Sequence, residues 1–199
     1  MKTDWTAFAI QTAPSIEPVT TAEVKLVSRI RSTVTTYDTM LANYITAARQ
    51  AVEKYLGRAL ITQTLNLYYD NFPCNNEEMI LIYSPVRSVS SITYVDTDGV
   101  TQTLSASNYR TDLLSITPRI TIAYGESWPS IREVTNAIKI TYIAGYGDAA
   151  TDVPAPIKEC IKSLCADLFE HPEANLEFKL EQNRTYQFLL NSYMIRNIE

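Results

Sequence analysis

The spacing of apolar residues changes twice along this 199-residue chain. From about Thr20 to Leu56, apolar side chains recur at three- and four-residue steps, which is typical of amphipathic helices. From about Ala59 to Tyr142 the period becomes two, as in strands that bury one face. After Gly147 the helical spacing returns. The pattern predicts an α+β fold in which a helical frame, with two N-terminal and two C-terminal helices, contains a contiguous antiparallel β-rich insert.

Four segments carry the helical spacing, and local signals mark their ends. A capping box at Thr20 with Glu23 and an N-cap at Asp38 mark two helix starts, and Gly57 is a glycine C-cap. Proline marks two further boundaries, at Pro154 and at His171-Pro172. The expected helices are a short one after residue 20, then about 39–56, 157–170 and 181–198. A polar connection over 173–179 joins the last two.

The β-rich middle divides into about seven short strands. Turn signals separate them, most clearly Pro85 and the Asp-Thr-Asp-Gly sequence at 96–99. The expected strands cover residues 60–69, 79–83, 86–95, 100–104, 109–113, 119–124 and 137–142. The expected organisation is an N-terminal arm over 1–18, a helical hairpin over 19–58, the β-rich insert over 59–144 and C-terminal helices over 145–199.

The charge balance and the apolar runs argue against two classes of partner. The 17 basic and 22 acidic side chains give a formal net charge of −5, whereas a protein that holds nucleic acid through its phosphates needs a basic excess. No apolar run approaches the roughly 20 residues of a membrane-spanning helix. Asp4 and polar neighbours stand where a signal peptide would be apolar. We therefore expect cytoplasmic synthesis and no membrane partner.

Cysteine and histidine usage leaves little room for catalysis or metal binding. The three cysteines form no Cys-x-x-Cys pair, and Cys160 and Cys165 lie among apolar positions, so both are expected to be buried thiols. The single histidine, His171, precedes a proline and suits the negative end of a helix better than a catalytic role. A zinc site or a Ser-His-Asp triad would need further partners.

Two motifs that can hold ligands are better explained as turns. Asp96 and Asp98 could begin a calcium loop, but Ser107 stands where the twelfth-position glutamate is required. The five glycines form no phosphate-binding pattern, and the Gly-Tyr-Gly sequence at 145–147 reads as a turn. The sequence therefore predicts no catalytic residues, no metal site, no cofactor and no enzymatic activity.

Features suited to association are more abundant. Thirteen tyrosines are many for this length, and tyrosine is enriched at protein contacts, although it can equally line a partly hydrated sheet. The last helix is amphipathic. Its apolar residues at helical spacing are Tyr186, Leu189, Leu190, Tyr193 and Met194.

The order of several short motifs is distinctive. They are the segments Val19–Lys25, Ala47–Arg58, Leu60–Thr64, Asp70–Pro73, Ser84–Asp96, Trp128-Pro129, Ile140–Gly147 and Val153–Lys158. In this order and spacing they resemble the head–tail connector (adaptor) proteins of long-tailed bacteriophages and of their prophage and gene-transfer-agent relatives. The resemblance covers about residues 19–170, which it implies form one connector domain.

The resemblance implies a non-enzymatic virion protein at the head–tail interface, assembled in the host cytoplasm. Members of this family form a ring, usually of twelve subunits, that docks on the portal protein after DNA packaging. The ring extends the DNA channel, through which DNA passes without specific binding, and offers a surface to a head-completion stopper or a tail protein. An acidic subunit suits such a channel, because like charge keeps DNA from adhering.

In this family the C-terminal segment commonly reaches the portal. The resemblance therefore predicts portal contacts at Tyr186, Leu189, Leu190, Tyr193 and Met194, with packing against this chain's own helices as the alternative. Two other functions stay open: a cytoplasmic enzyme or regulator with a site in the β-rich insert, and another head-completion or tail-completion protein. A substrate-sized cleft would favour the enzyme, and a mostly β-barrel architecture would favour the other virion protein.

Overall fold

The computed structural model describes residues 5–74, 77–171 and 183–195. The chain forms two compact units, which we call the strand unit (Met1–Ala13 and Thr62–Gly145) and the helical unit (Pro14–Ile61 and Tyr146–Glu199). Helices and antiparallel sheets are both present, so the predicted α+β fold class is confirmed. The expected polar connection over 173–179 lies outside the described residues.

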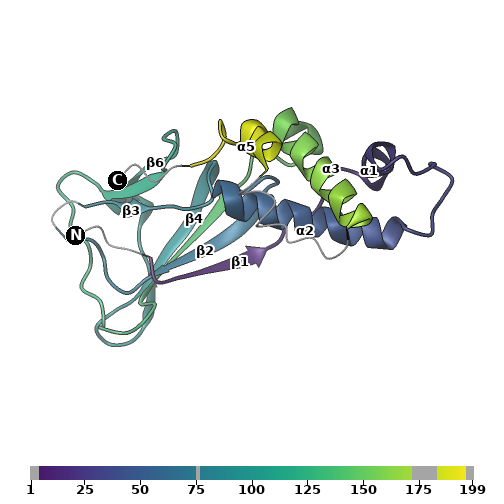
Figure 1. Cartoon of the computed structure of the whole chain (residues 1–199). Coiled ribbons are helices and arrows are strands. Elements are labelled where there is room, and N and C mark those ends of the chain that lie inside the picture. The colour runs from purple at the N-terminus through teal and green to yellow at the C-terminus, as the bar shows by residue number, and fades with distance from the viewer. Residues whose placement is uncertain (1–4, 75–76, 172–182, 196–199) are drawn as a thin grey trace. The chain divides into compact units, whose positions relative to one another are not determined.

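The strand unit contains a five-stranded antiparallel sheet (Figure 1). Its strands, in spatial order, are β1 (Ala7–Thr12), β2 (Gln63–Tyr69), β8 (Ile138–Ala144), β4 (Val86–Val95) and β5 (Thr101–Thr103). Residues alternate between buried and partly buried along β2 and β8, because successive side chains point to opposite faces. On the buried face Ile140 lies between Leu67 and Ile92 in register, and all three are fully buried.

A second, three-stranded sheet belongs to the same unit. Its order is β3 (Met79–Ile80), β7 (Arg119–Ile122) and β6 (Tyr109–Asp112). A short 3-10 helix over Ala106–Asn108 precedes β6, and a second, over Ala150–Asp152, belongs to the helical unit. The seven strands predicted after residue 59 are present, but β3 keeps only two residues of the expected 79–83. Ser84-Pro85 is a cis peptide bond, which fits the bend expected at this proline.

The predicted N-terminal arm over 1–18 contains a strand that the sequence did not predict. β1 pairs with β2, more than fifty residues later in the chain, and the Phe8 ring stacks on Tyr83 with 4.9 Å between ring centroids. Alanine and threonine occupy half of β1, so its apolar alternation is weak. A contact so distant in sequence leaves no local signal, which is why the segment reads as a loose arm.

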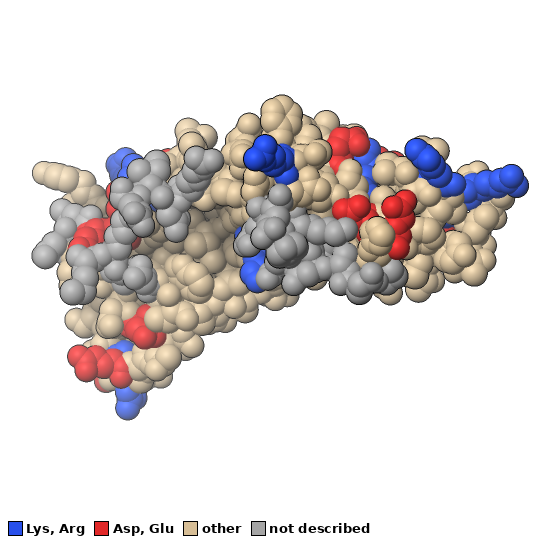
Figure 2. Space-filling view, viewed as in Figure 1, with Lys and Arg blue, Asp and Glu red and all other residues tan. Residues whose placement is uncertain are grey.

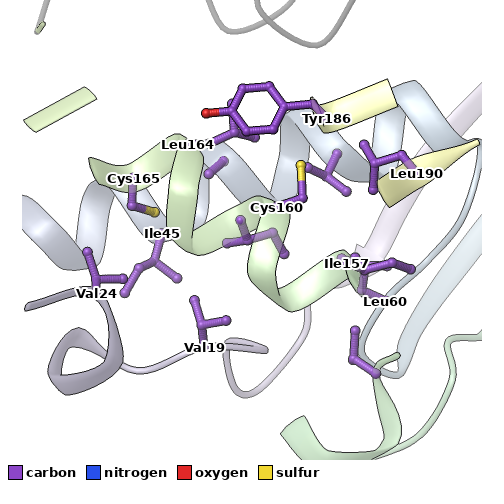
Figure 3. Packing of buried hydrophobic residues seen from close by; sticks show 14 of the residues in the cluster. Val19, Val24, Ile45, Leu60, Ile157, Cys160, Leu164, Cys165, Tyr186 and Leu190 are labelled. Atoms are coloured by element: carbon purple, nitrogen blue, oxygen red, sulfur yellow. The ribbon is translucent and has the colours of Figure 1, made fainter. Parts of the chain in front are cut away.

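The helical unit is built from four described helices. They are α1 (Thr21–Val27), α2 (Asp38–Leu56), α3 (Ala155–Glu170) and α5 (Arg184–Leu190). α3 contacts each of the other three, and the shared core joins residues such as Ile45, Leu164 and Leu190 (Figure 3). The members of this core are fully or almost fully buried. Their burial stabilises the unit, because α1 and α5, with seven residues each, are too short to be stable alone.

For α1 and α2, the predicted helix ends at Thr20 and Gly57 are confirmed, and the predicted N-cap at Asp38 is wrong. The Thr20–Glu23 capping box forms, and Gly57 takes the left-handed conformation with φ 65°. Asp38 is not the N-cap of α2: Tyr37 holds that position, and Asp38 lies in the first turn, where it pairs with Lys25. This pair explains the difference, because the carboxylate is engaged by a cation from α1.

The last helix is shorter than the expected 181–198. α5 starts after Asn183, whose side chain accepts a hydrogen bond of 2.9 Å from the Thr185 N–H. It ends at Leu190, and the Ile195 N–H donates to the Leu56 carbonyl at 3.2 Å. The Ile195 N–H is therefore bonded to the end of α2, and the helix does not continue to this residue. Residues 181–182 and 196–198 lie outside the described part of the chain.

A buried ion network joins the N-terminal segment of the helical unit to α2. Arg49 donates to Glu17 at 2.7 Å and to Glu53 at 2.6 Å, and both Arg49 and Glu53 are 5% exposed. Glu53 also accepts the Leu60 N–H at 2.9 Å. Burial raises the pKa of Glu53, while the Arg49 charge and the Leu60 hydrogen bond oppose the rise. The network therefore fixes residue 17, α2 and residue 60 together.

Candidate interaction surfaces

The described residues show no arrangement suited to catalysis or metal binding. No group of three or more His, Cys, Asp or Glu among them could hold a metal ion. A depression of about 370 Å³ in the strand unit is lined by residues such as Asp70 and Glu133, but Asp70 accepts the Asn136 N–H at 2.6 Å and so fixes a turn. His171 is the C-cap of α3, as its sequence position predicted. Within the described ranges, no helix has the length and apolar character needed to cross a membrane.

The cysteines have structural environments. Cys160 and Cys165 are fully buried in the helical core, which confirms the prediction, and Cys74 is exposed. Burial raises the pKa of both core thiols to about 12. A thiol that is both buried and protonated is a poor nucleophile.

We therefore expect one fast-reacting thiol in the native protein. Cys74 should react with a thiol reagent such as DTNB at pH 8, while Cys160 and Cys165 should react at least about a hundredfold more slowly. Titration in denaturant should then yield all three thiols. A second fast thiol in the native state would contradict the packing of α3, and a Cys74→Ser variant serves as the control.

The residues predicted to contact the portal lie on and just after α5. Tyr186 and Leu190 are buried in this chain's own helical core, and the Tyr186 hydroxyl donates to Asp167 at 2.6 Å. Leu189, Tyr193 and Met194 are partly buried against the same core. Self-packing, the alternative left open by the sequence, therefore accounts for Tyr186 and Leu190. The portal contact itself stays a prediction.

α5 also presents an aromatic residue that was not among the predicted portal contacts. Phe188 is 81% exposed, two positions from the buried Tyr186 and Leu190 on either side. In a helix, residues two apart do not share a face, so burial of those two directs Phe188 outward. The signal was present in the spacing, because Phe188 falls outside the apolar stripe.

The loop between β6 and β7 carries a second exposed apolar pair. Leu114 is 100% exposed and Ile116 is 66% exposed. The loop is nevertheless held in place: Asp112 accepts the Ser115 N–H at 3.3 Å and binds Arg119 at 3.1 Å. An ordered loop loses little conformational freedom on binding, so this tip is suited to insert into a partner.

The connection between α1 and α2 combines apolar and basic residues. Leu26 is 78% exposed at the end of α1. Arg29 and Arg31 follow, both exposed, and their side chains make no ion pair or hydrogen bond with the described residues. Leucine beside unpaired arginines is a composition typical of protein contacts, where arginine is enriched.

Charged residues are scattered within each unit. Figure 2 shows acidic and basic side chains interspersed among uncharged ones on the visible face of each, rather than gathered into one basic patch. This distribution agrees with the net charge of −5 and does not resemble the footprint of a protein that binds nucleic acid through phosphates. The exposed apolar residues are therefore the more informative candidates.

Comparisons with known proteins find a matching family model and several similar solved structures. A family model described as "Head completion protein" matches residues 18–175. A chain in the neck of an empty gene transfer agent particle, computed with C6 symmetry, is 22% identical with a TM-score of 0.79, and the match covers 98% of each chain. A chain of the virion of a native gene transfer agent particle is 21% identical (TM-score 0.78, 98% of each chain). A chain in the native neck computed with C12 symmetry is also 21% identical (TM-score 0.73, 98% of each chain). Comparison with curated proteins finds no match.

Proposed function

Because this chain belongs to the head completion protein family, we propose that it forms the connector ring between the head and the tail of a virus-like particle. A structural virion role follows from the family, and the predicted resemblance to connector proteins is confirmed at that level. The ring, its docking on the portal and its DNA channel are the proposal. It has twelve subunits, assembles after DNA packaging and receives a stopper or tail protein on its far side.

The observation that carries the proposal is exposed apolar surface on ordered elements. Leu114 and Phe188 are large apolar residues that are 100% and 81% exposed, and each stands on an element fixed by hydrogen bonds or core packing. Isolated exposed apolar residues are common, but a rigid element that presents one is typical of an interface anchor. The similar chains in necks computed with C6 and C12 symmetry support a ring, which needs unlike contact surfaces on each subunit.

In this proposal the channel does not bind DNA specifically. An acidic subunit with interspersed charges repels the phosphates weakly, so DNA can slide past it. In the same proposal the protein acts without catalysis and is found in the virion, after assembly in the host cytoplasm. Electron microscopy of the purified protein, alone and mixed with the portal protein of the same particle, tests the ring. A chain that stays monomeric in the presence of the portal would contradict it.

Portal docking is best tested at the exposed face of α5. Removal of residues 181–199 also takes Tyr186 and Leu190 out of the core, so a truncated chain loses stability and binding together. Phe188→Ser removes only exposed area. If Phe188 becomes buried at the portal, its loss should weaken binding by roughly 10- to 100-fold, since burial of such a side chain contributes about 1.5–3 kcal/mol.

The measurement is the affinity of the ring for the portal, with thermal unfolding as a check on folding. Ser192→Ala, at an exposed position just after the same helix, is the matched control and should bind as the wild type does. Unchanged portal affinity in Phe188→Ser would place the portal contact elsewhere. The partly buried Leu189, Tyr193 and Met194 are then the next residues to change.

A further inference from the structure

The four edge strands of the strand unit differ in how their edges are protected. A strand at the edge of a sheet presents unpaired N–H and C=O groups, and proteins usually discourage pairing there with charged residues or proline. In the three-stranded sheet the edge strand β6 follows this rule, because it contains Arg110 and Asp112.

The two edges of the five-stranded sheet lack this protection. No charged residue occurs between Asp4 and Glu17, a stretch that contains β1, or between Asp98 and Arg110, a stretch that contains β5. Among the described residues β1 pairs only with β2, and β5 pairs only with β4. Because alternate residues of a strand direct their backbone groups to opposite sides, about half of these groups on β1 have no strand partner.

Side chains on both edges are open to contact. Ala9 and Ile10 are exposed on β1, with Ile10 at 51%. Thr101, Gln102 and Thr103 are all exposed on β5, where the Gln102 side chain donates to the Asp96 carboxylate at 2.9 Å. A register shift between Ile10 and Thr12 is confined to the C-terminal end of β1, so most of the strand keeps regular geometry. Uncharged edges of this kind are templates for an added strand.

We propose that β1 of one subunit pairs with β5 of a second copy of this chain, so that the five-stranded sheets join edge to edge. The inference rests on the proposed ring. The two edges are unlike each other, which is what a head-to-tail contact between identical subunits requires. The contrast with the edge strand β6 favours them, because the charged residues of β6 discourage such pairing.

Strand direction makes the contact specific. The order β1-β2-β8-β4-β5 is antiparallel throughout, so β1 and β5 run in the same direction. If two subunits join with the same face of their sheets on the same side, β5 of one subunit therefore pairs in parallel with β1 of its neighbour. β5 has three residues, so the shared ladder is short and each contact is weak. Closure of a ring compensates for weak single contacts, because every subunit is then held on two sides.

Cross-linking of assembled rings tests the contact. In a Cys74→Ser background, the double variant Ala9→Cys with Gln102→Cys should give a ladder of covalent multimers with a short bismaleimide, analysed by denaturing electrophoresis. Each single variant should give dimers at most. The pair Ala9→Cys with Thr111→Cys, which uses an exposed position on the charged edge β6, is the matched control and should give no ladder.

A charged residue introduced on the edge strand β1 gives a second test of the contact. Ala9→Lys should raise the protein concentration needed for half-assembly of the ring by about tenfold or more, which corresponds to about 1.4 kcal/mol. Thr111→Lys adds the same charge to β6 and should leave assembly unchanged. If the wild-type ring forms, the double cysteine variant gives no series of cross-linked multimers, and Ala9→Lys assembles normally, the edge contact is overturned and the proposed ring is not. A chain that forms no ring with or without its portal would overturn both the contact and the proposed function.

Discussion

Replacement of Arg49 by alanine should lower the free energy of unfolding by about 3–5 kcal/mol. Arg49 is 5% exposed and neutralises two carboxylates, Glu17 and Glu53. Without the guanidinium, Glu53 would remain buried beside a second acid, and the hydrogen bond from the Leu60 N–H does not neutralise its charge. An uncompensated buried charge is among the most costly single changes in a protein interior.

The penalty in Arg49→Ala should shrink as the pH falls. Burial already raises the pKa of Glu53, and loss of the Arg49 charge, which lowers it, should raise it further. A carboxyl group whose pKa is higher in the folded state than in the unfolded state favours folding at low pH and loses that contribution as the pH rises through the folded value. Relative to the wild type, the variant should therefore be closest in stability at pH 4.5 and below, and its deficit in the free energy of unfolding should grow as the pH rises above that value.

Urea unfolding at several pH values measures both effects. Arg31→Ala removes an exposed arginine whose side chain makes no ion pair with the described residues, and should change stability by less than about 0.5 kcal/mol at any of these pH values. Glu53→Gln keeps an acceptor for the Leu60 N–H and should cost less than Arg49→Ala. A loss in Arg49→Ala no larger than that in Arg31→Ala would show that the network does not hold the helical unit together.

Local signals were sufficient for most of the fold. The capping box at Thr20 and the left-handed Gly57 depend on residues within a few positions, and both formed as the sequence predicted. The bounds of β4, Val86–Val95, also match, because Pro85 before the strand and the Asp-Thr-Asp-Gly turn after it mark its ends. Each of these features is decided by nearby residues, so the sequence contains the information directly.

The features that the sequence did not predict depend on distant partners. β1 is defined by pairing with β2, the position of Asp38 by an ion pair with Lys25, and the end of α5 by a hydrogen bond from Ile195 to Leu56. The candidate surfaces are of the same kind. Spacing identified the apolar stripe of the last helix, but only tertiary packing separates its buried Tyr186 from the exposed Phe188.

The double variant Leu114→Ser with Ile116→Ser should lose assembly while keeping its fold. Neither side chain packs into the core, since Leu114 is 100% exposed and Ile116 is 66% exposed. The loop conformation depends on Asp112, Ser115 and Arg119, which the variant retains. The free energy of unfolding should therefore change by less than about 0.5 kcal/mol.

Binding should respond very differently. If both side chains become buried in a neighbouring neck protein, each contributes about 1.5–3 kcal/mol, and their joint loss weakens the contact by on the order of a hundred- to ten-thousandfold. The measurement is incorporation of the variant into the neck of assembled particles, compared with the wild type at equal protein concentration. Co-sedimentation with DNA-filled heads reports the same contact without the tail.

Tyr124→Ser provides the matched control for this pair. Tyr124 is also 100% exposed but follows the opposite end of β7, at the base of the hairpin rather than at its tip. If only the Leu114/Ile116 variant loses incorporation, the tip of the β6–β7 loop is an interface anchor. The control variant also removes an exposed apolar side chain, so a general loss of apolar surface would affect both variants. Equal incorporation of both variants and the wild type would contradict this. The Asp112–Arg119–Glu78 ion pairs would then serve to order the hairpin itself, since they need no partner to form.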